Sequence, residues 1–311
     1  PDVHVMRQIL HDWCPPALLR QLSRVRRRFR RGRDLYPSYE AALSESRGYE
    51  EDDLVDLMFE KTVRFRASLR HERRTSRPIE IDASNQRLLI ALHAARRDDR
   101  LNVLDFGGSC GHSAFLARVM LSEDVEIRWH VVETPAMVER ARRIAEPGLR
   151  FFTSIQDASD AFDDEIDLTL ASSALQHTPH PTDHLERLTQ VGARRLFVTR
   201  AGMSDEPGLE HELITILKSR RRFSGPGPVP PDFQDGPTSF PMTITPRATF
   251  ERIIRKRYDL LWRCREQRRV YVFDRYEIDL WGLMARRRDE TAAGTISDGR
   301  EPSHASFNRA A

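Results

Sequence analysis

A glycine-rich turn at residues 107–111 is the clearest chemical feature of the sequence. It follows an apolar run at 101–106, which predicts a strand, and precedes an apolar stretch at 112–121, which predicts a helix. Glycine lets the backbone come close to a ligand, and the first turn of a helix offers free N–H groups. The arrangement is therefore typical of a site for a nucleotide-like cofactor.

Two carboxylates near this turn narrow the choice of cofactor. Asp105 stands two residues before Gly107, where its charge would oppose a pyrophosphate but would bind an ammonium group. Ser109 stands where the dinucleotide motif G-x-G-x-x-G has its second glycine. Glu133 follows the predicted strand 127–132, where an acidic residue accepts hydrogen bonds from both ribose hydroxyls. S-adenosylmethionine has an ammonium group and a ribose, so these residues favour it over a nicotinamide or flavin cofactor.

Further polar side chains follow the predicted strands 167–171 and 195–199. In an open parallel sheet, ligands bind beyond the carboxyl ends of the strands, so these side chains should reach the same crevice. His177 is a candidate general base for a hydroxyl acceptor; the alternative is a hydrogen-bonded loop histidine. Arg200 is a candidate for binding an anionic acceptor such as a carboxylate or phosphate; the alternative is a surface salt bridge. The residues expected in the crevice are Ser172, Ser173, Gln176, His177 and Arg200.

Histidines and cysteines do not predict a metal site. His177, His180 and His184 are separated by Pro179 and Pro181, so no single helix presents the three rings together. The three cysteines lack structural-zinc spacing and are too few for a disulfide framework. We therefore expect a chain with neither a metal nor a disulfide framework.

Strands and helices alternate from residue 101 to about residue 200, which predicts a parallel sheet with helices on both faces. Residues 34–100 predict helices ahead of this pattern. We therefore expect an α/β fold: a Rossmann-like doubly wound sheet, mostly parallel with an antiparallel final strand, preceded by an N-terminal helical extension. The predicted strands are 101–106, 127–132, 149–152, 167–171, 195–199, 258–263 and 277–285, and the predicted helices are 39–43, 51–70, 84–95, 112–121, 135–145 and 183–190.

The stretch after residue 200 interrupts the alternation. Residues 208–223 predict a helix, and six prolines make 224–241 an irregular loop. Pro246 opens another helix, with Thr245 as its expected N-cap. We predict a helical extension at 1–100, a cofactor-binding domain at 101–286 with a lid at about 201–245, and a disordered tail at 287–311.

Composition sets broader limits. The chain has 311 residues, of which 39% are hydrophobic and 31% charged, with a formal net charge of +3. No apolar run reaches the roughly 18 residues of a membrane span, and no signal peptide is evident, so we expect a cytoplasmic protein. The small net charge disfavours nucleic acid as a partner. Residues 17–33 predict an arginine-rich amphipathic helix, which either contacts the inner membrane face peripherally or docks on the domain with a solvated face.

The chain resembles class I S-adenosylmethionine-dependent methyltransferases. More narrowly, it resembles bacterial methyltransferases of the LIC12133 type, which occur among surface-polysaccharide genes. The segments that carry the resemblance are Pro15-Pro16 with the basic residues after it, 36–41, 48–49, 103–111, 129–133, 152–155, 172–176 and the segment around Arg200. Two departures are Ser109 in place of a glycine and His112 in place of a small polar residue.

The resemblance implies roles for individual residues. Asp105 and the glycines would line the methionine end of the cofactor, and Glu133 would bind the ribose. Ser154 and Ile155 would flank the adenine, and Ser172 would lie with Ser173 beside the sulfonium. The predicted cofactor-binding residues are Asp105, Gly107, Gly108, Ser109, Glu133, Thr134, Ser154, Ile155, Ser172 and Ser173.

The expected reaction is methyl transfer from S-adenosyl-L-methionine to an oxygen, or to a nitrogen, of a small molecule or glycan precursor. S-adenosyl-L-homocysteine is the expected product. Two alternatives stay open: a different transferase that uses another portion of the sulfonium, and a non-catalytic scaffold docked to a membrane or partner enzyme through the arginine-rich helix. The identity of the acceptor and the oligomeric state are not encoded in any motif we identified.

Overall fold

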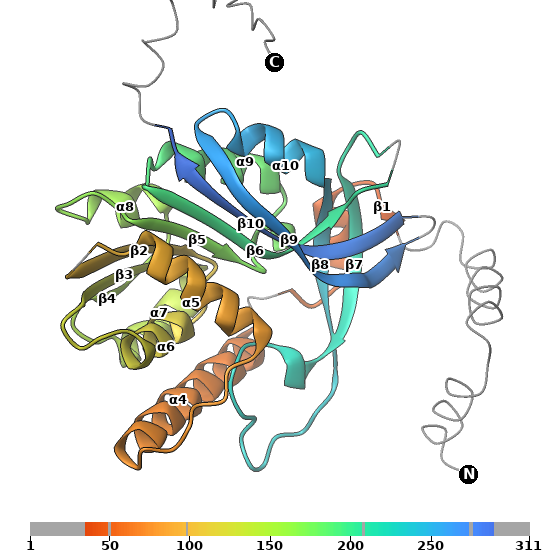
Figure 1. Ribbon diagram of the computed structural model, residues 1–311. Helices are drawn as coiled ribbons and strands as arrows, with labels where there is room; N and C mark the ends of the chain where they lie inside the picture. The colour runs from red at the N-terminus through yellow and green to blue at the C-terminus, as the bar shows by residue number, and fades with distance from the viewer. Residues whose placement is uncertain (1–34, 49–50, 98, 207–208, 274–275, 289–311) are drawn as a thin grey trace, which may run out of the picture.

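A mostly parallel sheet forms the centre of the molecule (Figure 1). The computed structural model describes residues 35–48, 51–97, 99–206, 209–273 and 276–288. Five parallel strands follow the order β4-β3-β2-β5-β6, and β10 pairs antiparallel with β6 and with the outer strand β9. The predicted α/β fold with an antiparallel final strand is confirmed. The strands are β2 (Arg100–Phe106), β3 (Glu126–Val132), β4 (Leu149–Phe152), β5 (Leu168–Ser172), β6 (Arg195–Ser204), β9 (Tyr258–Phe273) and β10 (Tyr276–Arg287).

Strand β2 is the point at which the sheet reverses its winding. It pairs with β3 on one side and with β5 on the other, and the chain proceeds outward in both directions from there. Connections on the two sides of such a strand leave opposite faces of the sheet, so a crevice opens beyond its carboxyl end. The glycine turn predicted to bind the cofactor follows β2 directly.

Helices cover both faces of the sheet. Strand residues alternate between the two layers: Val103 belongs to one core cluster, whereas Leu104 belongs to the other. The first cluster contains α4 (Asp52–Arg74), α5 (Ala83–Ala95), α6 (His112–Met120) and α7 (Pro135–Ala141), and the second contains α8 (Ile155–Asp160), α9 (Pro181–Gln190) and α10 (Arg247–Ile254).

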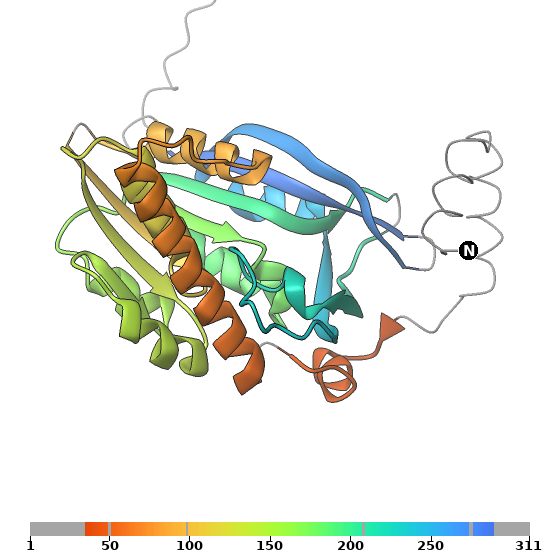
Figure 2. The same cartoon turned by 90° about the horizontal axis from the view of Figure 1, so that it is seen from below.

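The N-terminal helices α4 and α5 pack into the same core as the central strands. Met58 of α4 and Leu92 of α5 share a cluster with Val103 of β2. The predicted helices at 39–43, 51–70 and 84–95 are confirmed as α3 (Tyr39–Ser44), α4 and α5. Figure 2, the view from below, shows α4 crossing in front of the sheet, and α4 contacts α6 and α7. The arginine-rich segment 17–33 and most of the predicted tail 287–311 lie outside the described residues.

The helix predicted at 208–223 is wrong. Residues 213–220 form strand β7 (Leu213–Arg220), which pairs antiparallel with β8 (Pro237–Pro246) and with β1 (Leu35–Tyr36). The run Leu-Ile-Thr-Ile-Leu fits a helical and an extended spacing equally, and its β-branched residues favour the strand once a partner is present. The end of the predicted loop 224–241 also belongs to β8, whose Pro241 remains compatible because β8 bonds to β6 only through its last two residues.

A smaller prediction in the same region is wrong. Thr245 does not cap α10: the N-cap is Pro246, and no side chain bonds to the helix start. Strand β8 continues through Pro246, so Thr245 stays extended and donates its hydroxyl to Glu212 instead. The short helix α8, which begins after Ser154, was not predicted.

Lys61 ties α4 to the loop between β7 and β8. Its side chain is buried, and Nζ donates to the carbonyls of Arg222 at 2.9 Å, Ser224 at 2.8 Å and Gly225 at 2.7 Å. Three acceptors match the three donors of an ammonium group. Burial lowers the pKa of Lys61. Lys61 thus holds the irregular loop from another layer of the fold.

Replacing Lys61 by methionine should lower the free energy of unfolding by roughly 2–4 kcal/mol, because three buried carbonyls lose their donor. Urea denaturation measures the loss. The exposed Lys218 supplies the control, since its change to methionine should alter the free energy by less than about 0.5 kcal/mol. Equal midpoints for the two variants would contradict this role for Lys61.

Candidate cofactor site

The glycine turn has no room for side chains at its first two positions. Gly107 has φ +70°, and a Cβ there would lie 2.2 Å from the Cβ of Ala174. At Gly108 a Cβ would lie 2.4 Å from Oδ2 of Asp105. The amide of Gly107 donates to the carbonyl of Val132 at 2.9 Å, which fixes the turn to the end of β3. The backbone of the turn therefore passes directly against the Asp105 carboxylate.

Asp105 is a buried carboxylate at the end of β2. Asp105 is 1% exposed, and Nε1 of Trp129 donates to its Oδ2 at 3.0 Å. Burial raises the pKa of Asp105 to about 7, the indole hydrogen bond lowers it, the charge of Glu133 raises it and that of Arg200 lowers it. Near neutral pH, this group can gain or lose a proton according to the charge placed beside it.

Glu133 joins the turn to the end of β3. Oε1 accepts from the amide of Ser109 at 2.9 Å, and Oε2 accepts from the amide of Thr134 at 3.0 Å. Burial raises the pKa of Glu133. Each carboxylate oxygen has two lone pairs, so one acceptor position remains on each. The hydroxyl of Thr134 caps α7 through the amide of Met137, which orients this side chain toward the helix.

Arg200 of β6 lies near the Asp105 carboxylate. It has φ +51°, and its Nε donates to Oγ of Ser172 at 3.2 Å. Its charge lowers the pKa of both Asp105 and His112. The side chain thus brings a cation to the ends of β2 and β5, beside the residues predicted to line the methionine end.

His112 begins α6 directly after the turn. Its Nε2 lies 3.3 Å from Oγ of Ser113. Burial, with the positive charge of Arg200, lowers the pKa of His112 to about 3. The ring is therefore neutral at physiological pH, and it adds no positive charge to the group around Asp105.

Gln176 connects the residues after β5 to those of β6. Its Nε2 donates to Oγ of Ser173 at 3.1 Å and to the carbonyl of Arg200 at 3.3 Å. The side chain is 4% exposed, and its Oε1 has no hydrogen-bond partner within the described parts of the chain. Ser173 has φ +56°. The structure thus brings together most of the predicted crevice residues.

His177 is held by the β7–β8 hairpin and by α3. It lies in the short helix η2 (Leu175–His177), and its Nδ1 donates to the carbonyl of Pro241 at 3.2 Å. Its own carbonyl accepts from the hydroxyl of Tyr39 at 2.5 Å. Burial lowers the pKa of His177 to about 4. Because a carbonyl only accepts, Nδ1 carries the proton and Nε2 keeps a lone pair.

Backbone strain is concentrated around the crevice. Four non-glycine residues have positive φ in the part of the chain that the structure describes. Three of them, Ser109, Ser173 and Arg200, are predicted site residues, and the fourth is Ser76. Such conformations persist where the surrounding contacts enforce them and are common at binding sites.

A cavity of about 510 Å³ lies beside the crevice, between α8 and α9. Ser154 and Ile155 line it together with Phe106 and Val132 from the strand ends. The hydroxyl of Ser154 also caps α8 by accepting from the amide of Asp157. The two residues predicted to flank an adenine therefore border a cavity that is also lined by Val132, the residue before Glu133.

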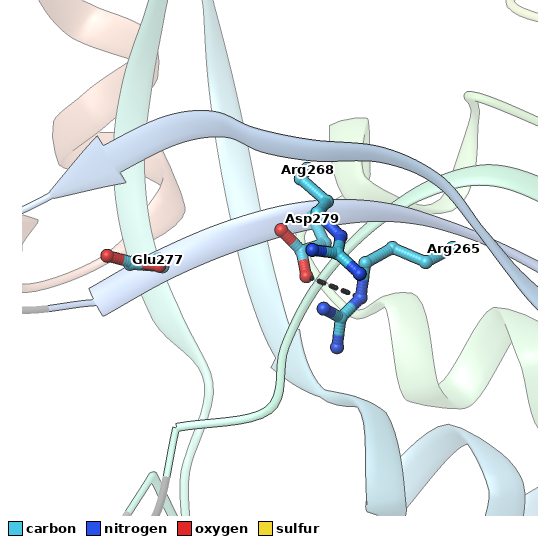
Figure 3. Close-up of a pocket in the computed structure, with 4 residues that line it drawn as sticks. All are labelled: Arg265, Arg268, Glu277 and Asp279. Atoms are coloured by element: carbon cyan, nitrogen blue, oxygen red, sulfur yellow. Dashed lines mark ion pairs between the residues drawn. The ribbon is translucent and has the colours of Figure 1, made fainter. Parts of the chain in front are cut away.

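A second cavity, of about 390 Å³, lies on β9 and β10 (Figure 3). Arg265, Arg268, Glu277 and Asp279 line it, and Nε of Arg265 lies 3.0 Å from a carboxylate oxygen of Asp279. Its lining contains no predicted site residue. It is a separate, mixed-charge feature of the sheet edge.

Three residues that support the crevice were not predicted to do so. Trp129 was given no role of its own, yet its indole donates to Asp105. Glu266 bonds to the backbone of Arg200, and Arg87 of α5 bonds to Glu266 at 2.8 Å. The run Arg-Cys-Arg-Glu-Gln-Arg-Arg around Glu266 looks like a solvated strand, so nothing in it indicates a buried glutamate.

The fold is similar to several solved structures, although the sequence matches no family model and no curated protein. The [4+2]-cyclase SpnF is 12% identical with a TM-score of 0.44, and the match covers 82% of this chain and 98% of that one. The CcbJ methyltransferase from Streptomyces caelestis is 14% identical with a TM-score of 0.41, covering 69% and 92%. The N-terminal domain of EvdMO1 with SAH bound is 13% identical with a TM-score of 0.41, covering 67% and 82%. Similarity of this degree identifies neither the reaction nor the ligand of this chain.

Among the described helices, none has the length and apolar character to cross a bilayer. Within the same residues, no three histidine, cysteine, aspartate or glutamate side chains cluster as metal ligands would.

Asp105→Asn should stabilise the protein at pH 8. The folded state raises the pKa of Asp105 from 3.8 to about 7, so between these values the folded state binds a proton that the unfolded state lacks. The free energy of unfolding of the wild type therefore falls as pH rises through this window. Asparagine keeps an acceptor for Trp129 and has no proton to lose, so the variant should gain roughly 2–4 kcal/mol relative to wild type between pH 4 and pH 8. Urea denaturation at both pH values measures this; a gain that does not change with pH would contradict the titration of Asp105.

Proposed function

We propose that the protein is an S-adenosylmethionine-dependent methyltransferase, of the bacterial LIC12133 type, that acts on an oxygen, or a nitrogen, of a small molecule or glycan precursor. The observation that carries the proposal is the buried Asp105 carboxylate against a side-chain-free turn, close enough to Arg200 and Glu133 for the charges of both to act on it. A buried carboxylate without a strong ion pair favours a cationic ligand.

The residues present fit the cofactor. Asp105 would bind the ammonium group of its methionine portion, and the absence of side chains at Gly107 and Gly108 lets the turn pass against Ala174 and the Asp105 carboxylate. The free lone pairs of Glu133 suit a ribose diol. The cavity beside Ser154 offers apolar contacts for an adenine. When bound, S-adenosylmethionine supplies an electrophilic methyl group for in-line displacement.

Arg200 is placed to bind the carboxylate of the same methionine portion. Its hydrogen bond to Ser172 and its effect on the pKa of Asp105 support a position beside the ammonium site. Together, Asp105 and Arg200 offer opposite charges to a zwitterion. An anionic acceptor is the other partner that suits this guanidinium, and the ligands described below separate the two.

His177 is the proposed general base for a hydroxyl acceptor. The hydrogen bond from Nδ1 to Pro241 orients the ring and leaves Nε2 as the acceptor of a proton. A pKa of about 4 keeps the ring neutral through the physiological range. It also makes the imidazole a weak base, so its main contribution would be to orient the acceptor and receive the proton as the new bond forms.

Calorimetric titration should show saturable binding of S-adenosylmethionine and S-adenosylhomocysteine and none of NAD. Asp105→Ala should weaken both sulfur ligands by about 100-fold, because the ammonium loses its charged partner. Asp164→Asn is the matched control and should bind as wild type, because Asp164 pairs with Arg100 at the amino end of β2 and its side chain is 42% exposed. Unchanged affinity in the Asp105 variant would exclude this site.

A mass-based screen of hydroxylated small molecules and nucleotide-activated sugars identifies the acceptor through the gain of one methyl group. Cofactor affinity without turnover on any acceptor, with vesicle binding lost on deletion of residues 1–33, would instead favour the scaffold alternative.

His177→Ala should lower turnover by about 10²–10³-fold while the affinity for S-adenosylmethionine changes less than about threefold, because the base acts on the acceptor. His180→Ala, at an exposed neighbouring histidine, is the control. At saturating cofactor, wild-type turnover should show no acid limb near pH 6.5, since the pKa of His177 lies near 4. Equal turnover in the His177 and His180 variants would remove His177 as the base.

A further inference from the structure

Glu266 of β9 is a buried carboxylate with no role in the function proposed above. Its side chain is 2% exposed. Oε1 accepts from the hydroxyl of Thr199 at 2.5 Å and from the amide of Arg200 at 3.1 Å, and Oε2 accepts from Nη2 of Arg87 at 2.8 Å. One side chain therefore joins β9, β6 and α5.

Irregular pairing in two strands makes these contacts possible. On β6, Val198 pairs with Leu283 and Ala201 with Trp281, so Thr199 and Arg200 lie opposite the single residue Gly282. Such a β-bulge redirects the side chain of the extra residue, here Arg200.

Strand β9 carries a matching irregularity. Gln267 pairs with Leu280 and Arg265 pairs with Trp281, so Glu266 is an extra residue in β9. Two bulges thus lie on either side of β10, and the side chain of one bonds to the backbone of the other.

Gly282 of β10 leaves the space through which the Glu266 side chain passes from β9 to β6. A Cβ at this position would lie 2.6 Å from Oε1 of Glu266 and 3.0 Å from Sγ of Cys264. Any other residue would displace the carboxylate from the amide of Arg200. The absence of a side chain on β10 therefore allows β9 to reach β6 across an intervening strand.

The contact stabilises an uncommon backbone conformation. Arg200 has φ +51°, a region that residues with a Cβ seldom occupy unless neighbouring contacts enforce it. A hydrogen bond from an amide to a carboxylate is stronger than one to a neutral acceptor. Arg87 supplies a balancing charge for the buried carboxylate.

We propose that Glu266 is the positioning residue for Arg200. By holding the bulge of β6, it directs the Arg200 guanidinium to Ser172 and to the ammonium site at Asp105, and it does so without touching the cofactor. The inference rests on the proposed function, in which Arg200 binds the carboxylate of S-adenosylmethionine. Loss of Glu266 should therefore remove recognition of that carboxylate and spare recognition of the rest of the cofactor.

The ratio of the affinities for two ligands reports recognition of the carboxylate. Decarboxylated S-adenosylmethionine keeps the ammonium, sulfonium and adenosine groups and lacks only the carboxylate. The wild type should bind S-adenosylmethionine about 10–100-fold more tightly than the decarboxylated ligand, the range expected for one charge-assisted contact. In Arg200→Met this ratio should fall to about one.

Three further variants separate positioning from folding. Glu266→Ala and Gly282→Ala should both reduce the ratio toward one, the second by displacing the carboxylate while every charged residue is kept. Glu266→Gln retains an acceptor for the amide of Arg200 and should restore part of the ratio. The matched control is Glu146→Gln, which breaks a cluster with Arg66, Arg70 and Arg118 away from the crevice. It should lower the thermal midpoint and leave the ratio unchanged.

The outcomes are distinct. A wild type that binds neither ligand overturns the proposed cofactor and the inference with it. A wild type that binds both equally, with no change in Arg200→Met, excludes the carboxylate contact. A ratio that falls in Arg200→Met but stays at the wild-type value in Glu266→Ala and Gly282→Ala overturns the role of Glu266 while the proposed function stands.

Discussion

The Asp105 carboxylate is the constraint on which the rest of the crevice depends. A charge at the end of a buried strand requires polar neighbours, and the structure provides an indole donor from β3 and a cation from β6. It also requires space, which Gly108 leaves open because a Cβ there would overlap the carboxylate. Asp105 and the two residues that supply its donor and its cation come from three strands of the central sheet, β2, β3 and β6. The doubly wound order, which places β2 between β3 and β5, is what brings their ends together.

Contacts between layers extend this arrangement to the rest of the molecule. The N-terminal half of α4 packs against the β7–β8 hairpin through Leu54 and Phe240, and its middle packs against the helices that cover the central sheet. Lys61 adds three hydrogen bonds to the loop before β8. The hairpin in turn holds His177 through Pro241. The elements around the crevice are thus tied to the central sheet by a few specific polar contacts and by continuous apolar packing.

The parts that sequence could predict are those in which local pattern and tertiary structure agree. The strands 101–106 and 127–132, each followed by polar or glycine residues, were assigned correctly because burial of most of their residues leaves them mainly apolar. Asp105, Gly107, Gly108 and Glu133 were found as candidates from their positions at strand ends, and the structure places them together. Strand β7 was mistaken for a helix because its pairing with β8, distant in sequence, decides between two equally suitable periodicities.

Glu266 could not be predicted at all. Its role depends on two bulges and on a glycine in an intervening strand, and none of these is visible as a local motif. Contacts of this kind hold the residues of the crevice in strained backbone conformations. Ser109, Ser173 and Arg200 occupy an unfavourable backbone region, and each has an amide, carbonyl or side chain bonded to a neighbour at the crevice. The buried charge of Asp105 adds a further cost in the absence of a cation. A site that is strained and partly uncompensated in this way gains stability when a complementary ligand binds, which is the usual relation between stability and function at a preorganised site.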